Sequence, residues 1–302
     1  MPRGREYPPR PRGLPAPGDE GVGASAASVG RAFCAAKVDR RRIPMTEDRV
    51  AAPGLLNDVA AIARQAGALI MEIYATDFAV RGKQDASPVT EADERAEKLI
   101  VPALRALAPE VPVVAEEAVA AGSVPEVGEW FWLVDPLDGT KEFISRNGEF
   151  TVNIALVHRG EPVLGVVFAP ALDRLFAGAR GQGARVEEAG AVRPIRCREV
   201  PEAGLTVVAS RSHGDAAALD AFLAGRKVAA LANAGSSLKL CLVAAGEADL
   251  YPRLGRTMEW DIAAGHAVLA AAGGCVHTMA GAPLHYGKPG FDNPHFVASA
   301  KR

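Results

Sequence analysis

The sequence predicts a mixed α/β protein in which helices and an antiparallel sheet come first and a smaller α/β unit follows. Its 302 residues suffice for one large or two ordinary domains with a substantial core. Apolar residues make up 49% and charged residues 23%, and 31 Gly with 22 Pro indicate many turns. Two helical patterns and then strand-like runs fill the first 200 residues, whereas β-runs alternate with Ala-rich helices after Pro201.

In the first part the expected elements follow one another along the chain. Apolar residues at helical spacing from Leu55 to Ile73 predict an amphipathic helix. Thr90-Glu91-Ala92-Asp93 has the form of a capping box that opens a second helix through about Leu107. The strand-like runs that follow are Val111–Ala115, Trp130–Val134, Thr151–Val157 and Val163–Phe168, with turns at Arg159-Gly160 and Arg180–Gly183.

The second part has a βαβα order. Its β-runs are Thr206–Ser210, Val228–Leu231 and Ala248–Tyr251, and its helices are Asp215–Leu223, Ser236–Ala245 and Asp261–Ala272. This change of pattern predicts a domain boundary near residue 200. We expect an α+β domain over residues 46–200 and an α/β domain over residues 201–302.

Residues 1–45 differ in composition from the rest of the chain. They carry nine basic and four acidic side chains, a net charge of +5, whereas the remaining 257 residues carry −7. Seven Pro and six Gly without apolar periodicity cannot bury enough surface to offset chain entropy, so we expect a disordered basic extension. No apolar run of about 7–15 residues follows the arginines, so we do not expect an export signal; translation beginning at Met45 would explain the segment.

Charge, hydropathy and cysteines exclude several classes of protein. A net charge of −2 creates no general positive field that would hold nucleic acid. No apolar stretch reaches the roughly 18 residues of a membrane span. The cysteines form no CxxC pair and indicate neither a disulfide framework nor a zinc site. They are scattered along the chain at Cys34, Cys197, Cys241 and Cys275. We therefore expect a cytoplasmic protein that acts on a small molecule, as a monomer or a homodimer.

Carboxylates gather at the ends of the predicted elements. The strand at Trp130 runs into Asp135-Pro136-Leu137-Asp138-Gly139-Thr140, a turn that can aim two carboxylates and the Leu137 carbonyl at one point, as Mg²⁺ requires. Gly139 and Thr140 lie where a helix or turn begins, so their N–H groups could hold a phosphate. An ordinary Asp/Pro/Gly turn explains this motif equally well.

Three further carboxylates each have a simple alternative explanation. Glu116, beside Glu117, suits a charged loop; Asp93 suits the capping box; Asp261 suits an N-cap. Together with the turn they make four carboxylate sites in a chain that has no Ser-His-Asp or Cys-His signature. Their combination favours a metal site over four coincidences.

These residues resemble a known superfamily. Asp135–Thr140, Trp260–Gly265 and Ala115–Glu117 look like the Mg²⁺-dependent, lithium-sensitive phosphatases that include inositol monophosphatase, and the resemblance runs from about Leu55 to Ser299. Within this superfamily, five further segments are similar to the branch of CysQ-type 3′(2′),5′-bisphosphate nucleotidases. They are Lys83–Asp93, Lys141–Phe143, Ser210–His213, Gly235–Lys239 and Leu250–Arg253. Ile262 departs from that branch, which often has Thr there, and this bears on substrate preference more than on metal binding.

The resemblance implies a fold and a set of site residues. The fold is a sugar-phosphatase-like αβαβα sandwich, with the metal site mainly in the first domain. Two or three Mg²⁺ ions would be held by Asp93, Glu116, Asp135, the Leu137 carbonyl, Asp138 and Asp261. Asp93, Glu116 and Thr140 would orient the attacking water. Substrate would be contacted by Gly139, Thr140, Lys141, Arg211, His213, Ser236, Lys239 and Arg253, for whose charged members ordinary surface charge is the alternative.

The resemblance also implies an activity. We expect Mg²⁺-dependent, Li⁺-inhibited hydrolysis of the 3′-phosphate of adenosine 3′,5′-bisphosphate to AMP and phosphate, with the sulfated nucleotide as a further substrate. Inositol phosphate, fructose bisphosphate or histidinol phosphate stay open as substrates, because such relatives share the metal core. An inactive binding protein on the same scaffold is the alternative of another class, although every expected metal carboxylate is present.

Overall fold

A computed structural model describes residues 44–78, 80–82, 88–210 and 216–301, and these described residues form one compact unit. Residues 1–43 of the predicted extension lie outside the described residues. Met45, the last residue of that extension, is buried and its backbone N–H donates to Glu110 Oε1 at 2.8 Å. The extension as predicted is therefore too long by this residue, which packs in the folded unit.

The helices match the predicted ones and add three short ones. They are α1 (Glu47–Ala51), α2 (Pro53–Tyr74), α3 (Glu91–Leu107), α4 (Glu116–Ala120), α5 (Thr140–Ile144), α6 (Ala216–Leu223), α7 (Leu238–Ala244) and α8 (Glu259–Ala271), with 3-10 turns at Pro170–Leu172 and Pro289–Phe291. Within the described ranges, no helix has the length and apolar character needed to cross a bilayer.

The strands form two larger sheets and two small ribbons. The seven-stranded sheet holds, in order, β3 (Val113–Ala115), β4 (Trp130–Asp138), β5 (Thr151–His158), β6 (Glu161–Ala169), β7 (Arg174–Ala179), β8 (Gly183–Glu188) and β9 (Ala191–Ile195). The five-stranded sheet has the order β11 (Val228–Ala234), β10 (Leu205–Ser210), β12 (Leu250–Arg253), β16 (Phe296–Ala300) and β14 (Gly274–Thr278). The ribbons pair β1 (Val80–Gly82) with β2 (Pro88–Thr90), and β13 (Thr257–Met258) with β15 (Asp292–Asn293).

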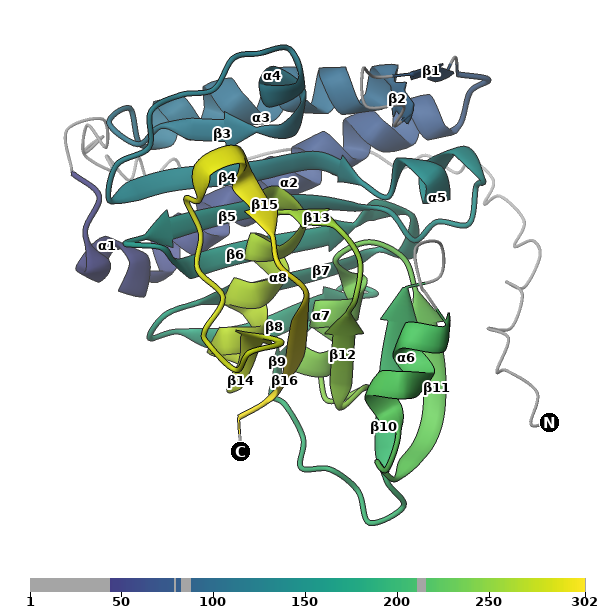
Figure 1. Cartoon of the computed structure of the whole chain (residues 1–302). Coiled ribbons are helices and arrows are strands. Elements are labelled where there is room, and N and C mark those ends of the chain that lie inside the picture. Colours follow the sequence, from purple (N-terminus) through teal and green to yellow (C-terminus); the bar gives the residue numbers. More distant parts are fainter. Residues whose placement is uncertain (1–43, 79, 83–87, 211–215, 302) are drawn as a thin grey trace, which may run out of the picture. The chain divides into compact units, whose positions relative to one another are not determined.

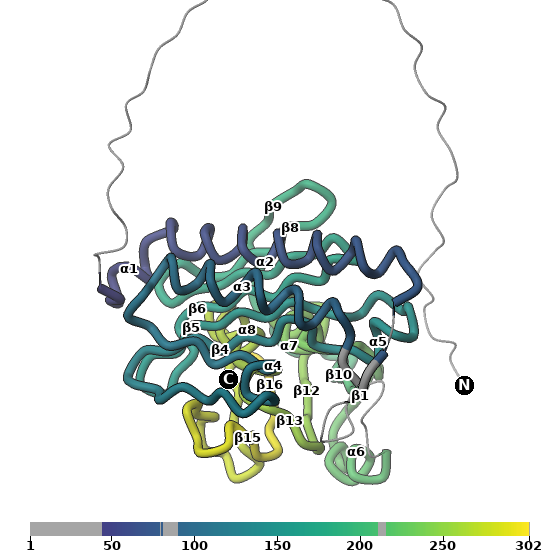
Figure 2. The backbone as a smooth tube through the Cα atoms, turned by 90° about the horizontal axis from the view of Figure 1, so that it is seen from above, coloured from purple at the N-terminus to yellow at the C-terminus, as the bar shows by residue number. Residues whose placement is uncertain are grey.

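These elements stack in the order helix, sheet, helix, sheet, helix (Figure 1). The long helices α2 and α3 run side by side over one face of the larger sheet, as Figure 2 shows from above. Helices α7 and α8 fill the space between the two sheets, and α6 packs on the outer face of the smaller one through Leu223. The predicted αβαβα sandwich is confirmed.

Strand β4 continues further than its apolar run predicts. It ends at Asp138 rather than Val134, and it pairs antiparallel with β5 through Asp135 opposite Asn153 and Asp138 opposite Thr151. Three steps along β4 thus oppose two along β5, which is a β-bulge. Because Pro136 inside the bulge has no N–H to donate to the ladder, the irregularity falls where the sequence requires it.

The smaller sheet follows the predicted βαβα order, since β10, β11 and β12 are parallel and α6 and α7 connect them. The antiparallel pairs of β16 with β12 and β14 extend it. All strands of the larger sheet precede residue 200 and all strands of the smaller one follow it, yet α7 and α8 pack against both. The division into two domains at residue 200 therefore stays a prediction.

Candidate active site

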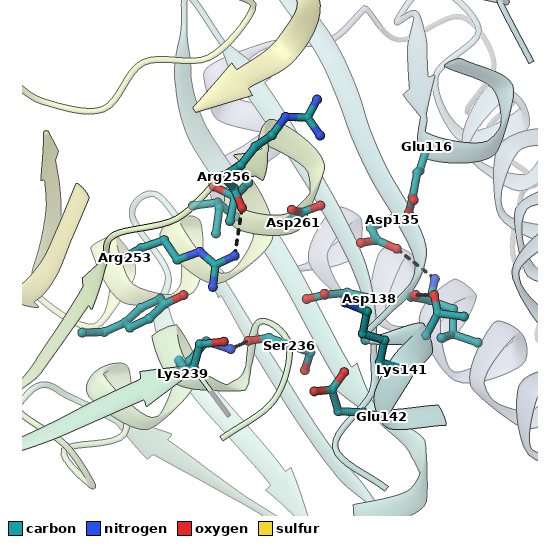
Figure 3. Close-up of a pocket in the computed structure, with 17 residues that line it drawn as sticks. Glu116, Asp135, Asp138, Lys141, Glu142, Ser236, Lys239, Arg253, Arg256 and Asp261 are labelled. Carbon is teal, nitrogen blue, oxygen red and sulfur yellow. Dashed lines mark hydrogen bonds between the residues drawn. The ribbon is translucent and has the colours of Figure 1, made fainter. Parts of the chain in front are cut away.

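A cavity of about 400 Å³ opens where β4 ends and α5 begins. The predicted site residues that line it are Glu116, Asp135, Leu137, Asp138, Gly139, Thr140, Lys141, Ser236, Lys239, Arg253 and Asp261. In Figure 3, Glu116 and Asp135 lie on one side, Arg253 and Lys239 on the other, and Asp138 and Asp261 between them. Two predicted contacts, Arg211 and His213, lie outside the described residues.

The turn after β4 needs its glycine. Gly139 has φ +90°, in the left-handed region, and a Cβ there would lie 3.2 Å from Glu142 Oε2 and 3.4 Å from the Phe150 Cα. Just before it, the Leu137 N–H donates to Asp135 Oδ1 at 3.0 Å, as in an ordinary Asx turn. The turn that the sequence offered as an alternative is therefore present, and it also directs both carboxylates into the cavity.

Asp93 joins a helix start to the cavity. Its Oδ2 accepts from the Thr90 N–H at 2.8 Å and from Thr90 Oγ1 at 2.6 Å, which confirms the capping box. Its Oδ1 lies 3.2 Å from Thr140 Oγ1, and that hydroxyl also lies 3.4 Å from the Leu137 carbonyl oxygen. One carboxylate thus caps α3 with one oxygen and holds the hydroxyl of Thr140 with the other.

Asp138 is held by two residues that the sequence reasoning missed. Its Oδ2 accepts from the Ser237 N–H at 2.7 Å and from Asn153 Nδ2 at 3.2 Å. Asn153 is fully buried in β5, where it is the one polar residue between Thr151 and His158, and a buried amide within this apolar run is the signal that could have identified it. Ser237 follows the predicted Ser236 directly.

Asp261 approaches the same point from the smaller unit. It is the third residue of α8 and not the N-cap that the sequence offered as an alternative explanation, because α8 begins two residues earlier at Glu259. Its Oδ2 accepts the Met258 N–H at 2.9 Å, and its carbonyl oxygen accepts the hydroxyl of Ser237. Ser237 therefore connects the Asp138 and Asp261 segments.

These carboxylates repel one another in a buried site. Burial raises the pKa of Asp135 well above its ordinary value, and the charges of Glu116, Asp138 and Asp261 raise it further. The pKa of Asp261 is also raised well above its ordinary value, by burial and then by Asp138 and Glu116. Burial raises the pKa of Asp138 too, although Lys239, Asn153 and the Ser237 N–H oppose the rise.

The donor set suits a hard divalent cation. Carboxylates and one backbone carbonyl supply only oxygen atoms, and a cation among them would relieve their repulsion. Within the described part of the chain, no three His, Cys, Asp or Glu side chains converge on a single point as they stand. Joint ligation therefore requires side-chain rotation, and the assignment of ligands stays a prediction.

The opposite wall is cationic. Arg253 is buried, and its Nη2 donates to the Arg256 carbonyl at 2.8 Å. Its Nε is inaccessible to solvent and has no hydrogen-bond partner among the described residues. Lys239 donates to the carbonyls of Ala234 and Ser236, and burial lowers its pKa to about 8. Lys239 thus holds the turn before α7, and direct contact with substrate stays a prediction for it.

Two further charged residues that line the cavity were not among the predicted site residues. Arg256 lies beside Arg253 and pairs with Asp292 at 2.9 Å, and Glu142 is buried on α5. Arg256 stands three residues beyond the predicted Leu250–Arg253 segment, and Glu142 lies inside the Lys141–Phe143 segment that the resemblance singled out.

The chain belongs to the inositol monophosphatase family, whose sequence model matches residues 55–300. It is 48% identical to the 3′(2′),5′-bisphosphate nucleotidase CysQ of Escherichia coli (strain K12) over 248 residues, which are 81% of this chain and 99% of that protein. The crystal structure of CysQ from Bacteroides thetaiotaomicron matches with a TM-score of 0.68 and 39% identity, covering 82% of this chain and 97% of the other. An inositol monophosphatase from Anabaena matches with a TM-score of 0.65 and 27% identity, covering 82% and 90%. The resemblance is confirmed.

Proposed function

We propose that this chain is a Mg²⁺-dependent phosphatase that removes the 3′-phosphate of adenosine 3′,5′-bisphosphate, giving AMP and phosphate. The observation that carries it is a single cavity with carboxylates around Asp138 on one side and buried Arg253 on the other. Such a site attracts cations and a multiply charged anion together. The near full-length similarity to CysQ of Escherichia coli supports the choice of nucleotide.

The metal ligands follow from the donor set. Two or three Mg²⁺ would be held by Asp93, Glu116, Asp135, the Leu137 carbonyl, Asp138 and Asp261. Bound there, Mg²⁺ supplies positive charge that acidifies water and neutralises charge on the leaving oxygen. Asp93 Oδ2 already accepts two hydrogen bonds from Thr90, whereas Oδ1 accepts one from Thr140 and keeps a lone pair that a cation could use.

Thr140 and its neighbours prepare the attacking water. The Thr140 hydroxyl donates its one hydrogen to Asp93 Oδ1, so its lone pairs point to other partners and can accept from a water molecule. Glu116, at the start of α4, supplies a second acceptor across the cavity. A water held by both is aligned for in-line attack, and the Asp93 contact keeps the hydroxyl in that orientation.

The cationic wall would take the phosphates. Arg253 lines the cavity, and its guanidinium offers a fixed positive charge and N–H donors of the kind that bind phosphate oxygens. Lys141, beside Gly139 and Thr140, lines the same cavity near the scissile phosphate. Predicted contacts by Arg211 and His213 would complete the nucleotide site.

A substrate comparison tests the proposal. The purified full chain with Mg²⁺ should show a higher kcat/KM for adenosine 3′,5′-bisphosphate than for inositol 1-phosphate. The reverse order would assign a polyol phosphate instead, and nucleotide binding without phosphate release would identify an inactive binding protein. Asp138→Asn should abolish most turnover, whereas Asp220→Asn, the same change at an exposed position on α6, should not.

A further inference from the structure

A second cavity lies away from the proposed active site. It has a volume of about 550 Å³ and shares no lining residue with the first. Its walls come from the middle and end of α8, from β14 near the C-terminal end of the chain (Figure 1), and from the turns that begin β6 and join β7 to β8. The volume falls within the roughly 300–1,000 Å³ of small-ligand sites.

Basic side chains predominate in this cavity. His266, His277, His285 and Lys301 line it from α8, β14, the loop before Tyr286 and the end of the chain. Lys301 has no ion pair or side-chain hydrogen bond with any described residue.

The cavity also has a charge-compensated side. Arg180 pairs there with Glu161, which lines the cavity too, and lies 3.7 Å from Glu47. Among the described lining residues, the positive charge without an ion pair therefore lies on the Lys301 side.

The pKa of His266 indicates that the electrostatic potential in the cavity is positive. This pKa is lowered to about 3, mainly by burial and to a smaller extent by repulsion from His277, His285 and Lys301. An anion placed among these groups would be attracted by the same charges.

The hydrogen bond of His266 defines its tautomer. Nδ1 lies 2.8 Å from the hydroxyl oxygen of Tyr286. Both side chains are buried, burial keeps the pKa of that phenol well above its ordinary value, and Nδ1 is the acceptor that the described structure provides for its hydrogen. We therefore assign the phenol as the donor to Nδ1, which places the hydrogen of neutral His266 on Nε2.

That Nε2–H has no acceptor in the described part of the protein, and it is not sealed from solvent. His266 is nearly buried and lines the cavity, so we place its Nε2–H at the cavity wall. A nearly buried donor without a partner, beside Lys301 and two further imidazoles, is an arrangement that binds an acceptor-only group.

We propose that this cavity is a second binding site, for a phosphate- or sulfate-bearing small molecule. Its oxyanion would accept from His266 Nε2 and from Lys301, with His277 and His285 on the flanks. The remaining volume leaves room for a small esterified group. The site is independent of the proposed phosphatase activity, because none of its residues belongs to the metal cavity.

Histidine side-chain NMR on the full chain tests this site without any need for turnover. Long-range ¹H–¹⁵N spectra of the metal-free protein, with resonances assigned through His277→Gln and His285→Gln, should show His266 as the Nε2–H tautomer. Inorganic phosphate, inorganic sulfate and AMP are titrated separately, with chloride at equal ionic strength. A saturable shift of His266 by the free ions indicates an ion site, and a tighter response to AMP indicates an ester site.

Charge variants localise the effect. Lys301→Glu should raise the apparent Kd for phosphate, measured from the shift of His266, by about tenfold or more. This corresponds to about 1.4 kcal/mol. Lys98→Glu, the same change at an exposed lysine on α3, should leave it unaltered. Equal responses in both variants, or a shift that chloride reproduces, would overturn the proposal.

A third variant tests the orienting hydrogen bond. Tyr286→Phe keeps the ring but removes the donor to Nδ1, so His266 should lose its tautomer preference and the phosphate response should weaken. Lys301→Glu should weaken binding while the tautomer remains. An unchanged tautomer in Tyr286→Phe contradicts the assigned role of Tyr286.

Discussion

Thr140 is the residue through which the start of α5 and the start of α3 meet. Its hydroxyl lies 3.2 Å from Asp93, and Asp93 is positioned by its own capping bonds to Thr90. The capping box was predictable because it is a local pattern of four residues. The contact with Thr140 joins residues 47 positions apart and follows from no local rule.

The hydroxyl of Thr140 should matter for turnover more than for binding. We expect Thr140→Ala to lower kcat by about 10²–10⁴-fold with little change in KM, because the water loses its orienting acceptor. Thr140→Ser should restore much of the rate. Ser145→Ala, which removes a hydroxyl bonded to the Glu142 carbonyl near the other end of α5, is the control. Equal losses in kcat for the Ala variants would contradict the role of Thr140.

The buried carboxylates should make the metal-free protein sensitive to pH. The pKa values of Asp135 and Asp261 are raised in the folded state, so the native chain binds more protons than the unfolded chain above about pH 4. Stability should therefore fall as pH rises from about 4 toward the raised pKa values, and the loss is complete above them. Mg²⁺ should reduce this loss by neutralising the carboxylates.

Denaturant unfolding in EDTA and in Mg²⁺, at several pH values, measures this effect. The free energy of unfolding should fall with rising pH in EDTA and fall less in Mg²⁺. If the free energy of unfolding of the metal-free protein rises over the same pH range, these carboxylates do not dominate the pH dependence of its stability.

At the scale of elements, α8 lies very close to the larger sheet. A Cβ at Gly165 in β6 would come within 2.2 Å of the Ala264 carbonyl oxygen, and one at Gly178 in β7 within 3.0 Å of the Val268 Cα. These two glycines allow the helix to approach, and the helix presents Asp261 in its first turn. The position of the carboxylate thus depends on residues that line no part of the cavity.

Gly165→Ala should disturb both stability and activity. Overpacking against backbone is expected to cost about 1–3 kcal/mol in the free energy of unfolding, and a displaced α8 should lower kcat/KM. Chemical denaturation and kinetics on one preparation measure both quantities. Gly128→Ala, where a Cβ meets nothing within 4 Å, provides the control. A fully stable and active Gly165→Ala would mean that α8 moves without displacing Asp261.

The strands show which elements a sequence can predict. The hairpin of β5 and β6 and the ribbon of β7 and β8 lie where their turn residues placed them. The bulge that extends β4 to Asp138, and the antiparallel pairing of β16, were not predictable, because they depend on partners distant in the sequence.

At the scale of the whole molecule, the folded unit accounts for the chemistry without the basic extension. All described residues of the proposed site lie between Asp93 and Asp261. A variant that lacks residues 1–43 and keeps Pro44 and Met45 should match the full chain in melting temperature and in kcat/KM, because Met45 retains its bond to Glu110. Thermal denaturation and the nucleotide assay measure this. A marked drop in either quantity would give the extension a role in the folded unit.

The sequence by itself determined the layered α/β class, most helices and hairpins, and the residues that resemble the inositol monophosphatase family, because each depends on local periodicity, capping or turn chemistry. The tertiary structure decided which atoms face one another. Asp138 and Asp261 come from distant segments, and only packing of α8 between the sheets and the bonds of Ser237 bring them to one cavity, which Asp93 reaches through Thr140. The same packing placed His266 and Lys301 in the lining of one cavity, which no local pattern predicts.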